Sequence, residues 1–89
     1  MQIFTGIGEL VGGTPLVRLV NIEEELGLVA RLLVKLESKN PGGSAKDRVA
    51  KYIIEDARAR GLIKEGSVII EPTSGNTGIG IAALAAACA

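Results

Sequence analysis

The sequence has 89 residues, enough for one small domain and too few for a two-domain enzyme. Ten basic residues balance ten acidic residues, and the aromatic residues are one Phe and one Tyr, which argues against a nucleic-acid partner. One Cys and no His exclude a disulfide framework and the usual zinc spacings, so we expect no metal site and a cytoplasmic setting. The longest apolar run, residues 81–89, is too short to cross a bilayer, and no membrane partner is expected.

The first third of the chain shows two weak signals. The run PLVRL, Pro15 to Leu19, predicts a strand. The segment from Ile22 to Leu26 predicts a short helix with Asn21 as its N-cap.

The middle of the chain predicts a strand followed by a helix. The run from Leu32 to Glu37 is apolar and β-compatible, and the turn residues SKNPGG end it. Ser44 offers an N-cap hydroxyl, and apolar residues then recur at helical spacing until Gly61 supplies a C-terminal glycine.

The last third repeats this order. Val68 to Glu71 predicts a second short strand, halted by Pro72, and Thr77 to Ala89 predicts a second helix. Strand, helix, strand, helix with short loops predicts the α/β class, as a parallel-sheet β-α-β-α unit. In such sheets, binding sites lie at the carboxyl ends of the strands. We therefore expect residues 1–89 to form a single partial α/β domain.

The terminal helix is apolar on every side and lacks the usual stop residues, so we expect it to be buried and to continue in a longer protein. The alternative is a naturally small protein whose last helix packs into a dimer interface.

Lys46 lies in the first turn of the predicted middle helix, where the helix dipole disfavours a cation. A positive helix end is one way to favour the free amine that Schiff-base chemistry needs. On this feature alone, a lysine that simply points to water is the better interpretation.

The run TSGNTG, from Thr73 to Gly78, lies between a predicted strand and a helix. It places backbone N–H groups and hydroxyls at a strand end, which is typical of an anion site. It is neither a Walker loop nor a GxGxxG motif. A tight turn that caps the helix is an equally good interpretation.

Four other residues are expected to be structural. The carboxylate of Asp47 suits a first helical turn, and Arg48 can tie the preceding loop to backbone carbonyls. Cys88 and Tyr52 are expected to pack in the core.

Three runs together carry a family resemblance: IGELVGGTPLVRL at Ile7–Leu19, NPGGSAKDR at Asn40–Arg48 and EPTSGNTGIGIA at Glu71–Ala82. They resemble cysteine synthase (O-acetylserine sulfhydrylase), a pyridoxal 5′-phosphate enzyme of the tryptophan-synthase-β fold group. Cystathionine β-synthase usually has Ala where Pro41 stands, so the resemblance favours cysteine synthase.

The resemblance implies a role for each motif. Lys46 matches the Schiff-base lysine, which also removes the substrate α-proton, and Asn76 matches the residue that bonds the cofactor's 3′-oxygen. The substrate α-carboxylate is held in the family by a loop that matches Thr73, Ser74, Gly75, Asn76 and Thr77. The implied substrates are O-acetylserine and sulfide, and the implied partners are a second subunit in a homodimer and a serine acetyltransferase.

Two departures are small: the family usually has Asn where Gly13 stands and Val where Ala45 stands. The family's phosphate cup lies beyond residue 89, so we expect this chain alone to be a poor enzyme. A non-catalytic anion-binding or oligomerising α/β module, and a related β-replacement or β-elimination enzyme, remain alternatives.

Overall fold

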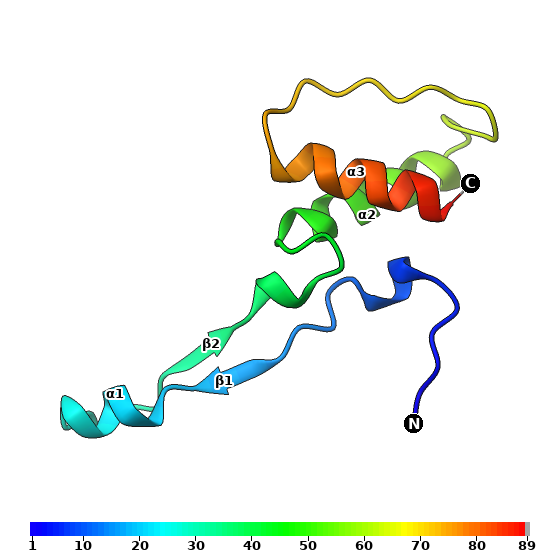
Figure 1. The fold of residues 1–89 in the computed structure, drawn as a ribbon. Coiled ribbons are helices and arrows are strands. Elements are labelled where there is room, and N and C mark those ends of the chain that lie inside the picture. The colour runs from blue at the N-terminus through cyan, green and yellow to red at the C-terminus, as the bar shows by residue number, and fades with distance from the viewer. Residues whose placement is uncertain (89) are drawn as a thin grey trace.

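The computed structural model describes residues 1–88. Its elements form two parts, a pair of helices and a narrow arm that projects away from them (Figure 1). In chain order the elements are the 3₁₀ helix η1 (Ile7–Leu10), β1 (Leu16–Arg18), α1 (Val20–Glu25), β2 (Leu33–Lys35), the 3₁₀ helix η2 (Glu37–Lys39), α2 (Lys46–Ala59) and α3 (Asn76–Ala87).

The arm consists of β1 and β2 with α1 at its tip. The two strands pair antiparallel, with Val17 opposite Val34. Both strands lie where the sequence predicts them. The parallel pairing that the sequence predicts concerns the strands at Leu32–Glu37 and Val68–Glu71, which is a different pair. β1 and β2 are antiparallel because the short connection through α1 reverses the chain direction.

A buried carboxylate fastens α1 to the arm. Glu23 is 6% exposed, and its carboxylate accepts hydrogen bonds from the Arg18 guanidinium at 2.7 Å and from the Leu32 amide at 3.0 Å. The helix starts at Val20 with Leu19 as its N-cap, so the predicted cap at Asn21 is wrong.

The core lies between α2 and α3, whose order and positions the sequence predicts correctly. Its buried apolar residues are Val11, Ala50, Ile54, Ile81 and Leu84. The two helices lie side by side and run in the same direction, as Figure 1 shows. Helix α2 ends at the predicted glycine, since Gly61 has a φ of +72°, which only glycine adopts readily.

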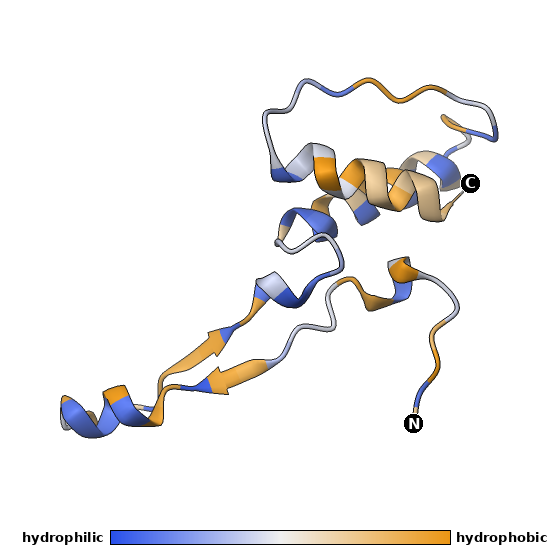
Figure 2. Ribbon diagram, viewed as in Figure 1, coloured by the Kyte–Doolittle hydropathy of each residue, from blue (hydrophilic) through white to orange (hydrophobic). Residues whose placement is uncertain are grey.

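The segment that joins α2 to α3 arches over the helix pair without forming a strand. The predicted strand Val68–Glu71 is therefore wrong within the described residues. Val68 and Ile70 are 83% and 89% exposed, and Figure 2 shows an apolar stretch within the arch, outside the core. A strand needs a hydrogen-bonding neighbour, and the sheet of β1 and β2 lies in the distant arm.

The chain exposes more surface than a compact chain of its length. Its accessible area is 6697 Å², against about 4,900 Å² expected from size alone. Two predicted core residues are among the exposed ones: Tyr52 is 72% exposed, and Cys88 is exposed as well. Helix α3 is buried along one side only, through Gly80, Ile81 and Leu84, so its predicted burial on every side is also wrong.

Within residues 1–88, no helix combines the length and the apolar character needed to span a membrane.

Candidate functional site

Lys46 is the first residue of α2, and its side chain is exposed. The backbone N–H of Lys46 donates to the Ser44 hydroxyl at 3.2 Å. Ser44 thus bonds the helix start as predicted, although the N-cap position itself is held by Ala45. The ε-amine of Lys46 is therefore accessible at the positive end of a helix.

The loop that precedes Lys46 is closed by Asn40, which is 4% exposed. Its side-chain amide donates to the Ser44 carbonyl at 3.0 Å and to the Glu37 carboxylate at 2.8 Å. Its Oδ1 accepts from the Gly12 amide at 2.8 Å. One buried side chain therefore ties three segments together beside the start of α2.

Arg48 fixes the same region from the helix side. Its guanidinium donates twice to the Glu37 carboxylate at 2.9 Å, to the Gly12 carbonyl at 3.1 Å and to the Thr14 hydroxyl at 2.9 Å. The predicted bond from Arg48 to a backbone carbonyl is confirmed. The roles of Glu37, Asn40 and Thr14 were missed, because nothing in their local spacing links residues so far apart in the chain.

The Arg48 guanidinium lowers the pKa of Glu37 from 4.5 to about 2, helped by the Asn40 amide and the Thr14 hydroxyl and opposed by burial. A carboxyl with a lowered folded-state pKa stabilises the fold above its unfolded pKa and loses that contribution as the pH falls through the folded pKa. We therefore expect the stability that Glu37 contributes to fall between pH 4.5 and about pH 2. Urea unfolding of wild type and Glu37→Gln across this range measures the effect.

The Glu37→Gln variant should be less stable than wild type at pH 6, and the difference should shrink towards pH 2. Subtracting the two curves removes the contributions of Glu9 and Glu23, whose pKa values are also lowered by their hydrogen bonds. A difference that does not change with pH would contradict the assignment.

The Thr73 side chain caps the start of α3. Its hydroxyl oxygen accepts hydrogen bonds from the Gly75 amide at 3.3 Å and from the Gly78 amide at 3.2 Å. The amides of Asn76 and Thr77 belong to the first turn and form no hydrogen bond to another part of residues 1–88. Ser74 and Asn76 are exposed. The capping turn and the anion-site interpretation are thus compatible in this loop.

Replacing Thr73 with Val should destabilise the chain by about 1 kcal/mol, because the isosteric side chain removes the acceptor for two amides at a helix start. Denaturant unfolding measures the loss. Ser74→Ala is the matched control, since Ser74 is an exposed neighbouring hydroxyl, and it should change stability by less than about 0.5 kcal/mol. An equal loss in both variants would contradict the capping role.

The parallel packing of α2 and α3 brings both motifs to one end of the helix pair. A Cβ built on Gly80, in the second turn of α3, would lie 3.1 Å from the Lys46 carbonyl oxygen. Lys46 and Asn76 each begin their helix at this end (Figure 1). The structure thus brings the two helix starts together, although no hydrogen bond joins the two side chains.

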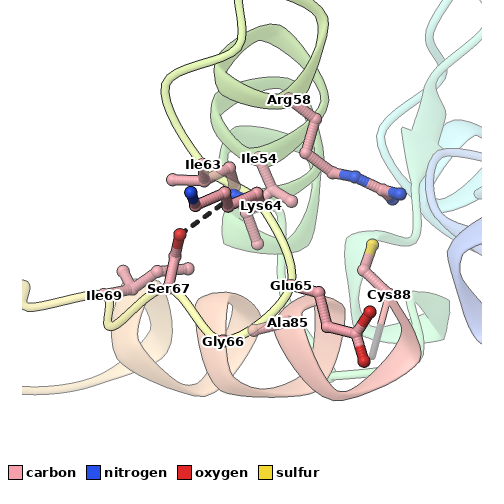
Figure 3. Close-up of a pocket in the computed structure, with 10 residues that line it drawn as sticks. All are labelled: Ile54, Arg58, Ile63, Lys64, Glu65, Gly66, Ser67, Ile69, Ala85 and Cys88. Carbon is pink, nitrogen blue, oxygen red and sulfur yellow. Dashed lines mark hydrogen bonds between the residues drawn. The ribbon is translucent and has the colours of Figure 1, made fainter.

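A separate cavity of about 780 Å³ lies at the other end of the helix pair. Figure 3 shows its lining, which includes Arg58 near the end of α2, Ile63 in the segment that follows α2, and Ala85 and Cys88 at the end of α3. It contains none of the predicted site residues. The described residues also contain no group of three or more His, Cys, Asp or Glu side chains that could hold a metal ion.

Comparison with known proteins decides the family. Residues 7–88 match the model of the pyridoxal-phosphate dependent enzyme family. The chain belongs to this family. The described α/β architecture is therefore the amino-terminal part of the tryptophan-synthase-β-like fold, as the sequence predicts.

Individual relatives agree with this assignment. The chain is 52% identical over 77 residues to cysteine synthase 1 of Emericella nidulans, covering 86% of this chain and 20% of the relative. It is 51% identical over 85 residues to cystathionine beta-synthase of Apis mellifera, covering 96% and 17%. A crystal structure of a hydrogen sulfide-producing enzyme from Fusobacterium nucleatum superposes with a TM-score of 0.87 at 46% identity, covering 97% and 28%. The chain thus spans about a fifth of the length of these curated relatives.

Proposed function

We propose that this chain contributes the cofactor lysine and the substrate loop to a cysteine synthase-like reaction. In this reaction O-acetyl-L-serine and sulfide give L-cysteine and acetate. The observation that carries the proposal is the shared end of the parallel helix pair, where Lys46 and the loop of residues 73–77 begin the two helices. Schiff-base chemistry with pyridoxal phosphate needs a lysine amine, and a helix start with free backbone amides suits the carboxylate of an amino-acid substrate.

The described residues offer partners for two groups of pyridoxal 5′-phosphate, its aldehyde and the 3′-oxygen on its ring. Lys46 offers an exposed primary amine, and Asn76 offers an exposed amide donor. When bound, the cofactor stores the electron pair released as the substrate Cα–H bond breaks. We propose that Lys46 Nζ holds the cofactor and moves this proton, and that the Asn76 side chain hydrogen-bonds the cofactor's 3′-oxygen.

The loop from Thr73 to Thr77 is proposed to hold the substrate α-carboxylate. The amides of Asn76 and Thr77 lie at the positive end of α3, where a carboxylate is stabilised. The hydroxyls of Ser74 and Thr77 can donate to it, and the Thr73 hydroxyl keeps one proton to donate while its oxygen accepts from two amides. The space beside Gly75, the N-cap of α3, is open, because a Cβ built there would meet no atom within 4 Å.

Cystathionine synthesis is the second candidate, because the identity to the Apis mellifera enzyme is nearly the same. Both reactions replace a group on the substrate's β-carbon, and they differ in the group that leaves and the thiol that attacks. Pro41, which follows the buried Asn40, favours the cysteine synthase hypothesis, because cystathionine β-synthase usually has Ala at this position.

Two chimeras test the proposal. In each, this chain replaces the matching residues of the Emericella nidulans or the Apis mellifera enzyme, which supplies the rest of the fold. We expect the first chimera to keep most of its parent's rate with O-acetylserine and sulfide, and the second to lose more of its own parent's rate. A folded, cofactor-bound first chimera without activity would contradict the proposal, and equal retention in both would remove the preference for cysteine synthase.

The partners, location and domain organisation are proposed as well. A homodimer and a serine acetyltransferase partner are proposed on the resemblance. A cytoplasmic location is proposed from the single, exposed Cys88. Residues 1–89 are proposed to act as one partial domain, because the helix pair that carries the site has a core of its own.

A further inference from the structure

Asp47 follows Lys46 directly and is the largest fully buried side chain among the described residues, at 0% exposure. Its Oδ2 accepts a hydrogen bond from the Gly42 amide, in the loop that precedes Lys46. Its Oδ1 has no hydrogen-bond partner within residues 1–88. A buried carboxylate oxygen without a hydrogen-bond partner is unfavourable, so the contacts that Asp47 makes within the described residues are of interest.

Two glycines make room for this carboxylate. A Cβ on Gly42 would overlap Oδ1 of Asp47, so the loop can come this close to the side chain only because residue 42 is glycine. A Cβ on Gly80, in α3, would lie 3.2 Å from the same oxygen, 3.2 Å from the Ala50 Cβ and 3.1 Å from the Lys46 carbonyl oxygen. All three distances are shorter than ordinary van der Waals contacts. Asp47 therefore fills the space between the lysine loop and α3.

This contact links the two halves of the proposed site. Gly80 lies four residues after Asn76, so the two positions share one face of α3 in successive turns. Lys46 and Asp47 occupy the first turn of α2. A larger or smaller side chain at position 47 or 80 would therefore change the spacing between α2 and α3 here. The start of α3 would then move relative to the backbone of Lys46.

We propose that Asp47 is a positioning residue that sets the separation between Lys46 and the loop of residues 73–77. Asp47 contacts Gly42 and Gly80 and acts through Lys46. The inference rests on the proposed function for its consequence in chemistry, whereas the contact itself can be tested without the cofactor.

The experiment uses the 89-residue chain in four variants: Asp47→Ala, Asp47→Asn, Gly80→Ala and Asp56→Ala. Asn keeps the shape of Asp and an oxygen for the Gly42 amide. Asp56 is an exposed carboxylate on the same helix and serves as the matched control. Gly80→Ala keeps Asp47 and gains helix propensity, so it decides the question if Asp47→Ala fails to fold.

The first readout is independent of the cofactor. We expect Asp47→Ala to raise amide hydrogen exchange at Gly42 at least tenfold and to weaken the NMR contact between the Gly80 α-protons and the Ala50 methyl group. Asp47→Asn and Asp56→Ala should stay within twofold of wild type. Unchanged exchange and an unchanged contact in a folded Asp47→Ala chain would overturn the proposal.

The second readout is the ratio of pyridoxal phosphate labelling at Lys46 to that at Lys51 after borohydride reduction. Lys51 lies on the same helix and is an internal reference. We expect the ratio to fall at least fivefold in Asp47→Ala and in Gly80→Ala, and to recover in Asp47→Asn. A ratio that stays at the wild-type value in Gly80→Ala would overturn the positioning role.

The two readouts separate failure of this inference from failure of the proposed function. If wild type labels Lys46 and Lys51 equally, the proposed function fails for this chain. The hydrogen exchange of Gly42 and the NMR contact between Gly80 and Ala50, measured in Asp47→Ala and Asp47→Asn, then test the positioning role of Asp47 without the cofactor.

Discussion

Replacing Lys46 with Ala should lower the turnover number of the Emericella nidulans chimera by at least about 1,000-fold. The lysine amine is proposed both to hold the cofactor and to move the substrate proton, and losing a general base alone costs about 100- to 10,000-fold. Steady-state formation of cysteine from O-acetylserine and sulfide measures the effect.

Lys51→Ala is the control, because Lys51 lies in the same helix and its amine pairs only weakly with Glu55 at 4.0 Å. It should change the rate by less than about twofold. A Lys46→Ala chimera that keeps more than a tenth of the rate would show that another group performs the proposed task.

Replacing Ile54 with Ala should destabilise the helix pair by about 2–4 kcal/mol. Ile54 is 3% exposed and is the central α2 side chain of the small core formed with Ile81 and Leu84. The substitution removes buried methyl groups and leaves a cavity that two helices can close only in part. Because a domain of this size has little stability to lose, thermal unfolding should show a large drop in Tm.

The adjacent Ile53 offers a matched control with the same change of side chain. It is 51% exposed, so Ile53→Ala should cost less than about 1 kcal/mol. Equal losses for the two variants would mean that α2 does not pack on α3 through the face that contains Ile54.

Elements governed by short-range patterns were predictable from the sequence. The helix from Lys46 to Ala59 has regular apolar spacing and a C-terminal glycine, and both signals act within a few residues. Membership of the family was predictable for the same reason, since the runs around Lys46 and Asn76 are each continuous in sequence.

Features that depend on distant partners were not predictable. The apolar run from Val68 to Ile70 suits a strand, yet a strand also needs a neighbour, which the described residues do not supply. The exposure of Tyr52 depends on which side of α2 meets α3. The low pKa of Glu37 depends on Arg48, eleven residues away in the chain.

The candidate site divides in the same way. The motifs predict Lys46 and Asn76 as site residues, and this prediction stays open. Their location at one end of the helix pair follows from the parallel order of two helices. The burial of Asp47 between Gly42 and Gly80 could not be predicted, because it depends on the packing of α2 against α3, which brings residues 47 and 80 together.

The most direct test of the account is to incubate the Emericella nidulans chimera, which supplies the rest of the fold, with pyridoxal phosphate, reduce with borohydride and locate the adduct by peptide mass spectrometry. The account predicts labelling concentrated on Lys46, lost in Lys46→Ala, together with a visible absorption band that shifts when O-acetylserine is added. Labelling spread evenly over the lysines, with no band that responds to O-acetylserine, would contradict the claim that these residues form the cofactor half of an active site.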